Sequence, residues 1–206
     1  LPAEELLHDP NDPGAHPETG QQSHLAVIKA YEAWDLTKGN PEIVIGVIDT
    51  GMATVHEDLT DNYYVNPLES PNGVDDDGNG YIDDIMGYDF ADDDNDPNAD
   101  TDISSALNHG SHVGGVAGAT TNNGIGVAGV GYDSRVAPLK GFTSDSVQST
   151  GVWEGVLYAA NNGYDVANLS WGNTSGFYQF FQDIIDYCVL EKDMVVVAAA
   201  GNTPAD

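Results

Sequence analysis

The sequence predicts an α/β fold in which helices cover both faces of a parallel central sheet. Short runs of branched aliphatic residues, typical of strands buried on both faces, alternate along the chain with segments whose apolar residues recur at helical spacing. This alternation requires crossover connections, which place the helices over the sheet. With 206 residues, the chain has the length of one domain with a sizeable core.

The predicted elements follow one another from the amino terminus. Residues 1–24 are polar and proline-rich, and we expect an extended arm there. Residues 25–37 have the apolar rhythm of a short helix, and residues 43–48 form a buried strand because five of the six are branched aliphatics. Residues 110–119 are mostly small and predict a helix that packs close to a neighbouring backbone. The remaining predictions are strands at 136–139, 166–170 and 194–200 and helices at 152–162 and 178–192.

The charge balance is strongly acidic. There are 34 acidic residues against 5 basic ones, a formal net charge of −29. Such a surface repels nucleic acids and anionic membranes, so we expect neither as a partner. The acidic residues concentrate in a predicted loop region at 60–104, where a divalent cation would relieve their repulsion.

Polar residues with catalytic potential follow the predicted strands. Asp49, Ser170 and Asn202 all lie at or just past strand ends, where parallel sheets place their sites. Asp49 belongs to Val-Ile-Asp-Thr-Gly at 47–51, and His109 lies at the start of the small-residue helix. An Asp and a His presented in this way can activate a serine hydroxyl. In that assignment His109 is the general base and then the general acid, Asp49 orients its imidazole, and the Asn202 amide stabilises the tetrahedral oxyanion.

Two other interpretations of these residues fit the sequence less well. Asp-Thr-Gly also occurs in aspartic proteases, but that mechanism needs a second such carboxylate, and the chain has no second Asp-Thr-Gly or Asp-Ser-Gly. His109 and His112 could be metal ligands, yet they do not form a His-Glu-x-x-His pattern.

The segment 75–84 has the spacing of a calcium loop. Its oxygen-bearing residues occupy positions 1, 3, 5, 7 and 9, with a glycine at position 6 that allows the sharp turn around an ion. Position 12 is a methionine, so we expect Asp83 or Asp84 to close the loop in place of a glutamate. The predicted ligands are Asp75, Asp77, Asn79, Tyr81, Asp83 and Asp84.

Four motifs, taken in order, resemble those of the subtilisin-like serine proteases, including their thermitase-like members. They are the aspartate motif at 45–52, the histidine motif at 109–118, Asn-Leu-Ser-Trp-Gly at 168–172 and Ala-Ala-Ala-Gly-Asn at 198–202. The resemblance implies a subtilisin-like sheet and peptide hydrolysis through an acyl-enzyme. It also implies that Ser170, Trp171 and Gly172 lie beside the substrate, with Trp171 as a pocket wall, and that Gly201 belongs to the oxyanion segment.

The resemblance implies further calcium sites, for two or three Ca²⁺ ions in all. One is a loop before the catalytic histidine, with ligands Asp89, Asp92, Asp94 and Asp96. The other is the loop at 121–127, whose ligand residues Thr121, Asn123, Ile125 and Val127 would be joined by Asp12 and Asp58.

The serine motif of this family does not occur within residues 1–206. We therefore expect the amino-terminal portion of one catalytic domain, incomplete on its carboxyl-terminal side and inactive as this chain alone. The expected protein is a secreted, extracellular protease that acts on peptide or protein substrates. Its serine would lie on a missing or separate carboxyl-terminal fragment. A truncated or non-catalytic calcium-binding relative is the alternative.

Overall fold

The fold is a parallel sheet with helices on both faces, as the sequence predicts, and the described residues form five strands of it. A computed structural model describes residues 9–99, 108–143, 148–172, 176 and 178–202. The strand order is β2-β3-β1-β4-β5, and every neighbouring pair is parallel. The strands are β1 (Val44–Asp49), β2 (Tyr88–Asp89), β3 (Arg135–Lys140), β4 (Val166–Leu169) and β5 (Val195–Ala198).

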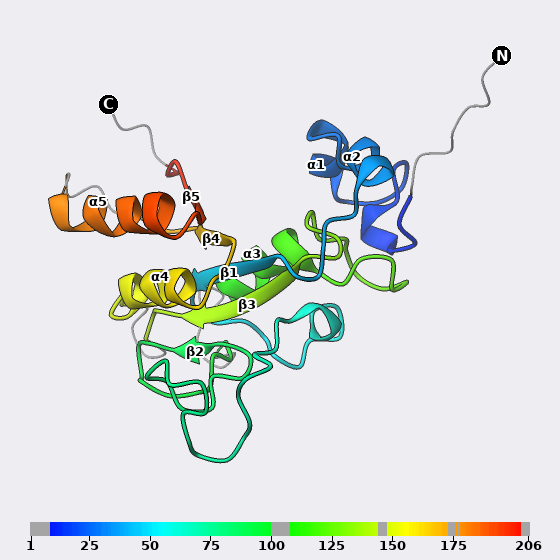
Figure 1. The fold of residues 1–206 in the computed structure, drawn as a ribbon. Coiled ribbons are helices and arrows are strands. Elements are labelled where there is room, and N and C mark those ends of the chain that lie inside the picture. The colour runs from blue at the N-terminus through cyan, green and yellow to red at the C-terminus, as the bar shows by residue number, and fades with distance from the viewer. Residues whose placement is uncertain (1–8, 100–107, 144–147, 173–175, 177, 203–206) are drawn as a thin grey trace.

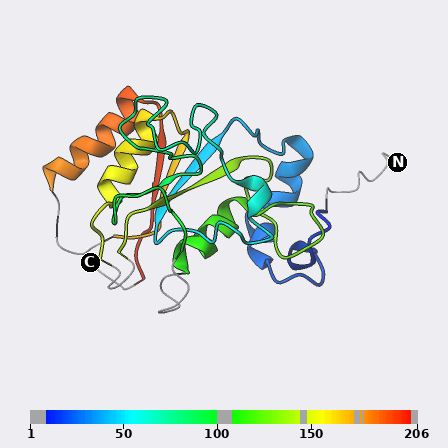
Figure 2. The same ribbon diagram turned by 90° about the horizontal axis from the view of Figure 1, so that it is seen from below.

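The helices divide between the two faces. Figure 2 shows α4 and α5 on one side of the strands and α3 on the other. The helices are α1 (Ser23–Val27), α2 (Ala30–Leu36), α3 (His109–Gly118), α4 (Val152–Asn161) and α5 (Gln179–Asp186). A π-helical turn, η3 (Tyr187–Glu191), extends α5, and 3-10 turns occur at η1 (Pro13–Ala15) and η2 (Thr60–Asn62). No helix in the described part of the chain is long and apolar enough to cross a membrane.

Side chains of β1 alternate between two hydrophobic clusters. Ile48 packs into the cluster on the α4 side, and a Cβ on Gly46 would contact Ala159 of α4 at 3.5 Å. Val47 faces the other way and packs with Val136 in the cluster beneath α3. Because successive strand residues point to opposite faces, Asp49 lies on the same face as Val47, toward α3.

A stripe of glycines lets α3 lie directly on the sheet. Gly110, Gly114 and Gly118 recur every four residues, and all three are buried. An added Cβ would come within 2.2 Å of the Gly51 carbonyl at the first position and 2.0 Å of the Met52 side chain at the second. At the third it would come within 2.6 Å of a β3 side chain. The prediction of a closely packed small-residue helix is therefore confirmed.

The predicted helix at 25–37 is in fact two helices. Lys29 separates them with a left-handed backbone conformation, φ 59°. The break turns the chain so that Leu25 of α1 and Trp34 of α2 both pack into one cluster with Tyr132. Packing thus overrides a periodicity that is continuous in the sequence.

The acidic region between β1 and α3 contains a short strand that the sequence does not predict. Its two residues, Tyr88 and Asp89, pair with Leu139 and Lys140 of β3. Elsewhere in this region the backbone is held mainly by turns and by carboxylates that accept N–H groups. The region is wrapped against the sheet below β3 (Figure 1).

Candidate active site

Asp49 is a buried carboxylate at the carboxyl end of the central strand. Its exposed fraction is 1%. Its backbone carbonyl accepts the N–H of Gly141 at 2.9 Å, and its Oδ1 accepts the N–H of Thr50 at 2.8 Å. These bonds fix both the main chain and the side chain, as a buried charged group requires.

His109 meets this carboxylate from the first turn of α3. Its Nδ1 lies 2.8 Å from Oδ1 and 3.0 Å from Oδ2 of Asp49. The carboxylate only accepts hydrogen bonds, so Nδ1 carries the proton in the neutral imidazole and Nε2 keeps the lone pair. The His109 side chain is 48% exposed, whereas that of Asp49 is 2% exposed. The pair therefore joins a buried acceptor to an imidazole that a substrate can reach.

Local hydrogen bonds hold the start of α3 against the segment that follows β1. The N–H of Gly110 donates to Thr50 Oγ1 at 3.0 Å. One residue later, Ser111 Oγ accepts the N–H of Ala53 at 2.9 Å. These contacts fix the position of the first turn of α3, and with it the position of His109 relative to Asp49.

The other predicted active-site residues lie at the same edge of the sheet. Ser170, Trp171 and Gly172 follow β4, and Gly201 and Asn202 follow β5. Ser170 and Trp171 are partly buried, and the other three are exposed. The Ser170 hydroxyl accepts a hydrogen bond from the Asn168 amide at 2.9 Å. The topology thus places these segments at the carboxyl edge of the sheet, where β1 also ends with Asp49, with β4 next to β1 and β5 beyond it.

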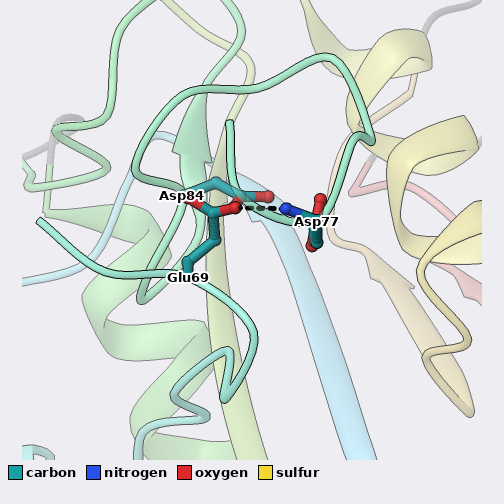
Figure 3. Close-up of side chains that lie close together, drawn as sticks. All are labelled: Glu69, Asp77 and Asp84. Atoms are coloured by element: carbon teal, nitrogen blue, oxygen red, sulfur yellow. Dashed lines mark hydrogen bonds between the residues drawn. The ribbon is translucent and has the colours of Figure 1, made fainter. Parts of the chain in front are cut away.

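Three carboxylates of the acidic region converge into one cluster. Oxygen atoms of Glu69, Asp77 and Asp84 all lie within 4.8 Å of one another. Figure 3 shows the three residues close together, with the backbone N–H of Asp77 donating to the Glu69 carboxylate. Asp84 and Glu69 are buried, and Asp77 is partly buried. Among the described residues this is the one group of three or more such side chains that could hold a metal ion, and it includes neither His109 nor His112.

Two predicted loop ligands face their own backbone instead of this cluster. Asp75 accepts N–H bonds from residues 78, 79 and 80, and Asp83 accepts them from residues 72 and 73. Asn79 donates its amide to Asp84 Oδ2 at 2.8 Å and so borders the cluster. Sequence reasoning missed Glu69, which precedes the regular aspartate spacing. Its carboxylate accepts N–H groups from residues 76, 77 and 83, which a loop folded back on itself brings together.

The loop at 121–127 closes around two buried aspartates. Asp12 is 1% exposed and accepts the N–H groups of residues 122, 123 and 124. Asp58 accepts the Asn123 amide at 2.9 Å and the N–H of Val127 at 2.8 Å. Residues more than 100 positions apart are thereby joined, in the combination that the resemblance implies. The side chains of Thr121 and Ile125 are partly buried beside them.

Asp89, in the third predicted calcium loop, already faces a cation. Its Oδ2 lies 2.8 Å from Lys140 Nζ, and both side chains are almost fully buried. Burial raises the pKa of Asp89, although the lysine and two backbone N–H groups oppose that shift. Asp92 lies 3.8 Å from the same ammonium. Asp94 and Asp96 accept backbone N–H bonds within the loop.

Comparison with known proteins identifies the family. Residues 40–206 match the subtilase family, Peptidase_S8. The chain belongs to the subtilase family. This subtilase is 36% identical over 171 residues to the thermophilic serine proteinase of Bacillus sp. (strain AK1), covering 82% of this chain and 35% of that protein. It is 32% identical over 196 residues to thermitase of Thermoactinomyces vulgaris, covering 95% and 58%.

The fold comparison agrees with the family. A solved protease of Pseudoalteromonas arctica PAMC 21717 superposes with a TM-score of 0.65 at 26% identity, covering 95% of this chain and 60% of that one. The subtilase thus spans 35%, 58% and 60% of these three proteins. Other relatives are described as extracellular proteases, among them Nep of Natrialba magadii.

Proposed function

We propose that this subtilase is the amino-terminal portion of a secreted, calcium-stabilised serine endopeptidase that hydrolyses peptide bonds through an acyl-enzyme. The observation that carries the proposal is the contact between Asp49 and His109 Nδ1 at 2.8 Å. A role in calcium binding alone requires neither an exposed imidazole nor a buried carboxylate that orients it.

In the proposed reaction His109 Nε2 takes the proton from a serine hydroxyl as that oxygen attacks the substrate carbonyl. Asp49 holds the imidazole in the required tautomer and stabilises the imidazolium that forms. Asn202 donates its amide to the oxyanion. His109 then returns the proton to the leaving amine. Water attacks the acyl-enzyme by the same route and releases the second product.

The nucleophilic serine is proposed to lie on the missing carboxyl-terminal side of the catalytic domain. That side is either part of a longer chain that contains these residues or a separate polypeptide. Two observations support a missing structural partner. This chain spans only 35% and 58% of two subtilase relatives. β5 also stands at the edge of the described sheet, where Val195 and Val197 are 57% and 49% exposed. A further strand or helix would cover these side chains.

Calcium is proposed to occupy the Glu69–Asp77–Asp84 cluster and the two loops implied by the family resemblance, at 89–96 and at 121–127. Three carboxylates within 4.8 Å of one another fit the oxygen-rich coordination that Ca²⁺ prefers, and the ion would offset their repulsion. Asp12 and Asp58 offer a second pair of buried carboxylates. The ions would stabilise the fold and take no part in the proton transfers.

The proposed substrates are peptides or proteins, and the proposed location is extracellular. The location is supported by relatives whose names describe extracellular proteases. The net charge of −29 argues against nucleic acid or anionic membranes as partners.

A serine-reactive fluorophosphonate, combined with denaturing intact-mass spectrometry, tests this function on the isolated protein. We expect label on a serine of a polypeptide that contains or accompanies this chain. The substitution His109→Ala should lower the labelling rate by about 10³-fold or more, because the hydroxyl loses its base. His112→Ala is the matched control, since His112 is exposed three residues later on the same helix. A single unlabelled species of 21.7 kDa would contradict the proposal and favour a truncated or non-catalytic calcium-binding protein.

A further inference from the structure

Trp171 contacts the catalytic strand in a way that a pocket wall does not require. The β1–β4 register ends with Val47 opposite Asn168. At the next residue of β1, the carbonyl of Ile48 accepts the indole N–H of Trp171 at 2.8 Å. A side chain thus continues the bonding between the two strands by one residue, up to Asp49.

The accepting carbonyl belongs to the peptide unit that carries Asp49. Atoms of one peptide unit lie in a plane, so a bond to the Ile48 carbonyl orients the N–H and Cα of Asp49 as well. On the opposite side of β1, Gly141 donates to the Asp49 carbonyl at 2.9 Å. The backbone around Asp49 is therefore held from two sides. β3 and the following Gly141 hold it on one side, and Trp171 holds the peptide unit before Asp49 on the other.

Aromatic side chains pack around the indole of Trp171. Its ring meets Trp153 of α4 edge-on at 5.4 Å and Phe142 at 6.5 Å. Trp153 in turn stacks on Phe181 of α5 at 4.3 Å with an interplanar angle of 7°. The position of Trp171 is thus set by the helices that cover the sheet, and its neighbours Ser170 and Gly172 are fixed with it.

We propose that Trp171 is a positioning residue for catalysis. Its indole N–H fixes the peptide unit before Asp49 and thereby the direction in which the carboxylate holds His109. Trp171 also anchors residues 170–172, so the proposed substrate-binding segment after β4 and the catalytic aspartate keep a fixed relative position. This inference rests on the proposed protease function.

The first test compares two Trp→Phe variants of the full-length protease that contains this chain. Trp171→Phe keeps an aromatic ring and removes the bond to Ile48. Trp34→Phe removes a similar bond, in which the Trp34 indole donates to the Val130 carbonyl at 3.1 Å in the amino-terminal cluster. We expect W171F to lower kcat about five- to twentyfold with KM changed less than about twofold. W34F should lower Tm about as much as W171F does, but it should leave kcat unchanged.

A double-mutant cycle with Asp49→Asn separates positioning from general loss of structure. If Trp171 acts through Asp49, W171F should change the residual kcat of D49N by less than about twofold. An equal fold-loss in both backgrounds, or an equal loss of kcat in W34F, would overturn the role of Trp171. So would an active protease that W171F leaves unaffected. A full-length protease without any activity would overturn the proposed function itself and this role with it.

Discussion

The Asp49–His109 pair depends on a burial difference between two touching residues. The carboxylate side chain is 2% exposed and the imidazole is 48% exposed. A buried charge restricts a partner to which it is hydrogen-bonded strongly, because water does not compete for it. The imidazole can therefore accept and release a proton at Nε2 while Nδ1 stays hydrogen-bonded to Asp49.

Asp49→Asn should lower kcat of the full-length protease by about 10⁴-fold, because an amide can also donate and so permits the wrong imidazole tautomer. Asp165→Asn is the matched control. Asp165 precedes β4 and accepts the N–H of Val44, at the start of β1, at 2.9 Å. We expect this substitution to reduce stability while kcat changes less than about twofold. Peptide-anilide kinetics with parallel thermal melts would measure both, and a similar kcat in D49N and D165N would contradict the assignment.

The sequence places a residue correctly where a continuous local pattern determines its position. The meeting of Asp49 and His109 follows because an aliphatic strand ends at the first and a small-residue helix begins at the second. Glu69 cannot be placed in this way, since it joins Asp77 and Asp84 only through the folded loop. Asp75 has the spacing of a ligand, yet local N–H groups of its own turn take its carboxylate. Short polar side chains readily form such turns, and spacing alone does not reveal them.

Among the elements, we expect the acidic loop to depend most on an added cation. We expect a calcium chelator to lower Tm of the protein by about 10 °C, since an ion that binds only the folded state stabilises it by mass action. Glu69→Gln should reduce this chelator effect because it removes one of three clustered carboxylates. Glu42→Gln, an equal charge change at an exposed residue outside the cluster, should leave it intact. Equal melting temperatures with and without chelator would exclude stabilisation by calcium.

The β2–β3 pairing contains the buried ion pair of Asp89 and Lys140. Lys140→Met should lower the free energy of unfolding by about 3–5 kcal/mol at neutral pH, because it leaves a buried carboxylate unpaired. Burial raises the pKa of Asp89, so its contribution to stability is greatest below its ordinary value and is lost as pH rises through the raised value. The K140M defect should therefore shrink on acidification. Urea unfolding with chelator present, at neutral and mildly acidic pH, would measure this, and a defect independent of pH would contradict it.

For whole elements too, the sequence predicts what local patterns determine and misses what tertiary packing determines. The strands other than β2, and the helices α3 and α4, are visible in the sequence because their patterns are continuous and their neighbours are turns. The break at Lys29 is not visible, since lysine has no preference for the left-handed region and only the cluster around Trp34 explains it. β2 is too short to leave a pattern and exists because β3 offers it a partner.

Across the whole molecule, a net charge of −29 opposes compact folding. We expect NaCl to raise Tm by a few degrees through screening of this repulsion. At matched ionic strength CaCl₂ should raise it further than MgCl₂, because general screening does not distinguish the two ions and coordination does. Equal shifts for all three salts would indicate screening alone.

The order in which the chain supplies its catalytic groups has a kinetic consequence. Asp49 and His109 are 60 residues apart, and the start of β1 is bonded to a residue 121 positions away. Contacts of such long sequence separation form slowly, because loop entropy is lost before any contact is gained. The active site is therefore assembled only as the parallel sheet closes. Recovery of the Asp49–His109 contact during refolding therefore reports formation of the sheet as a whole.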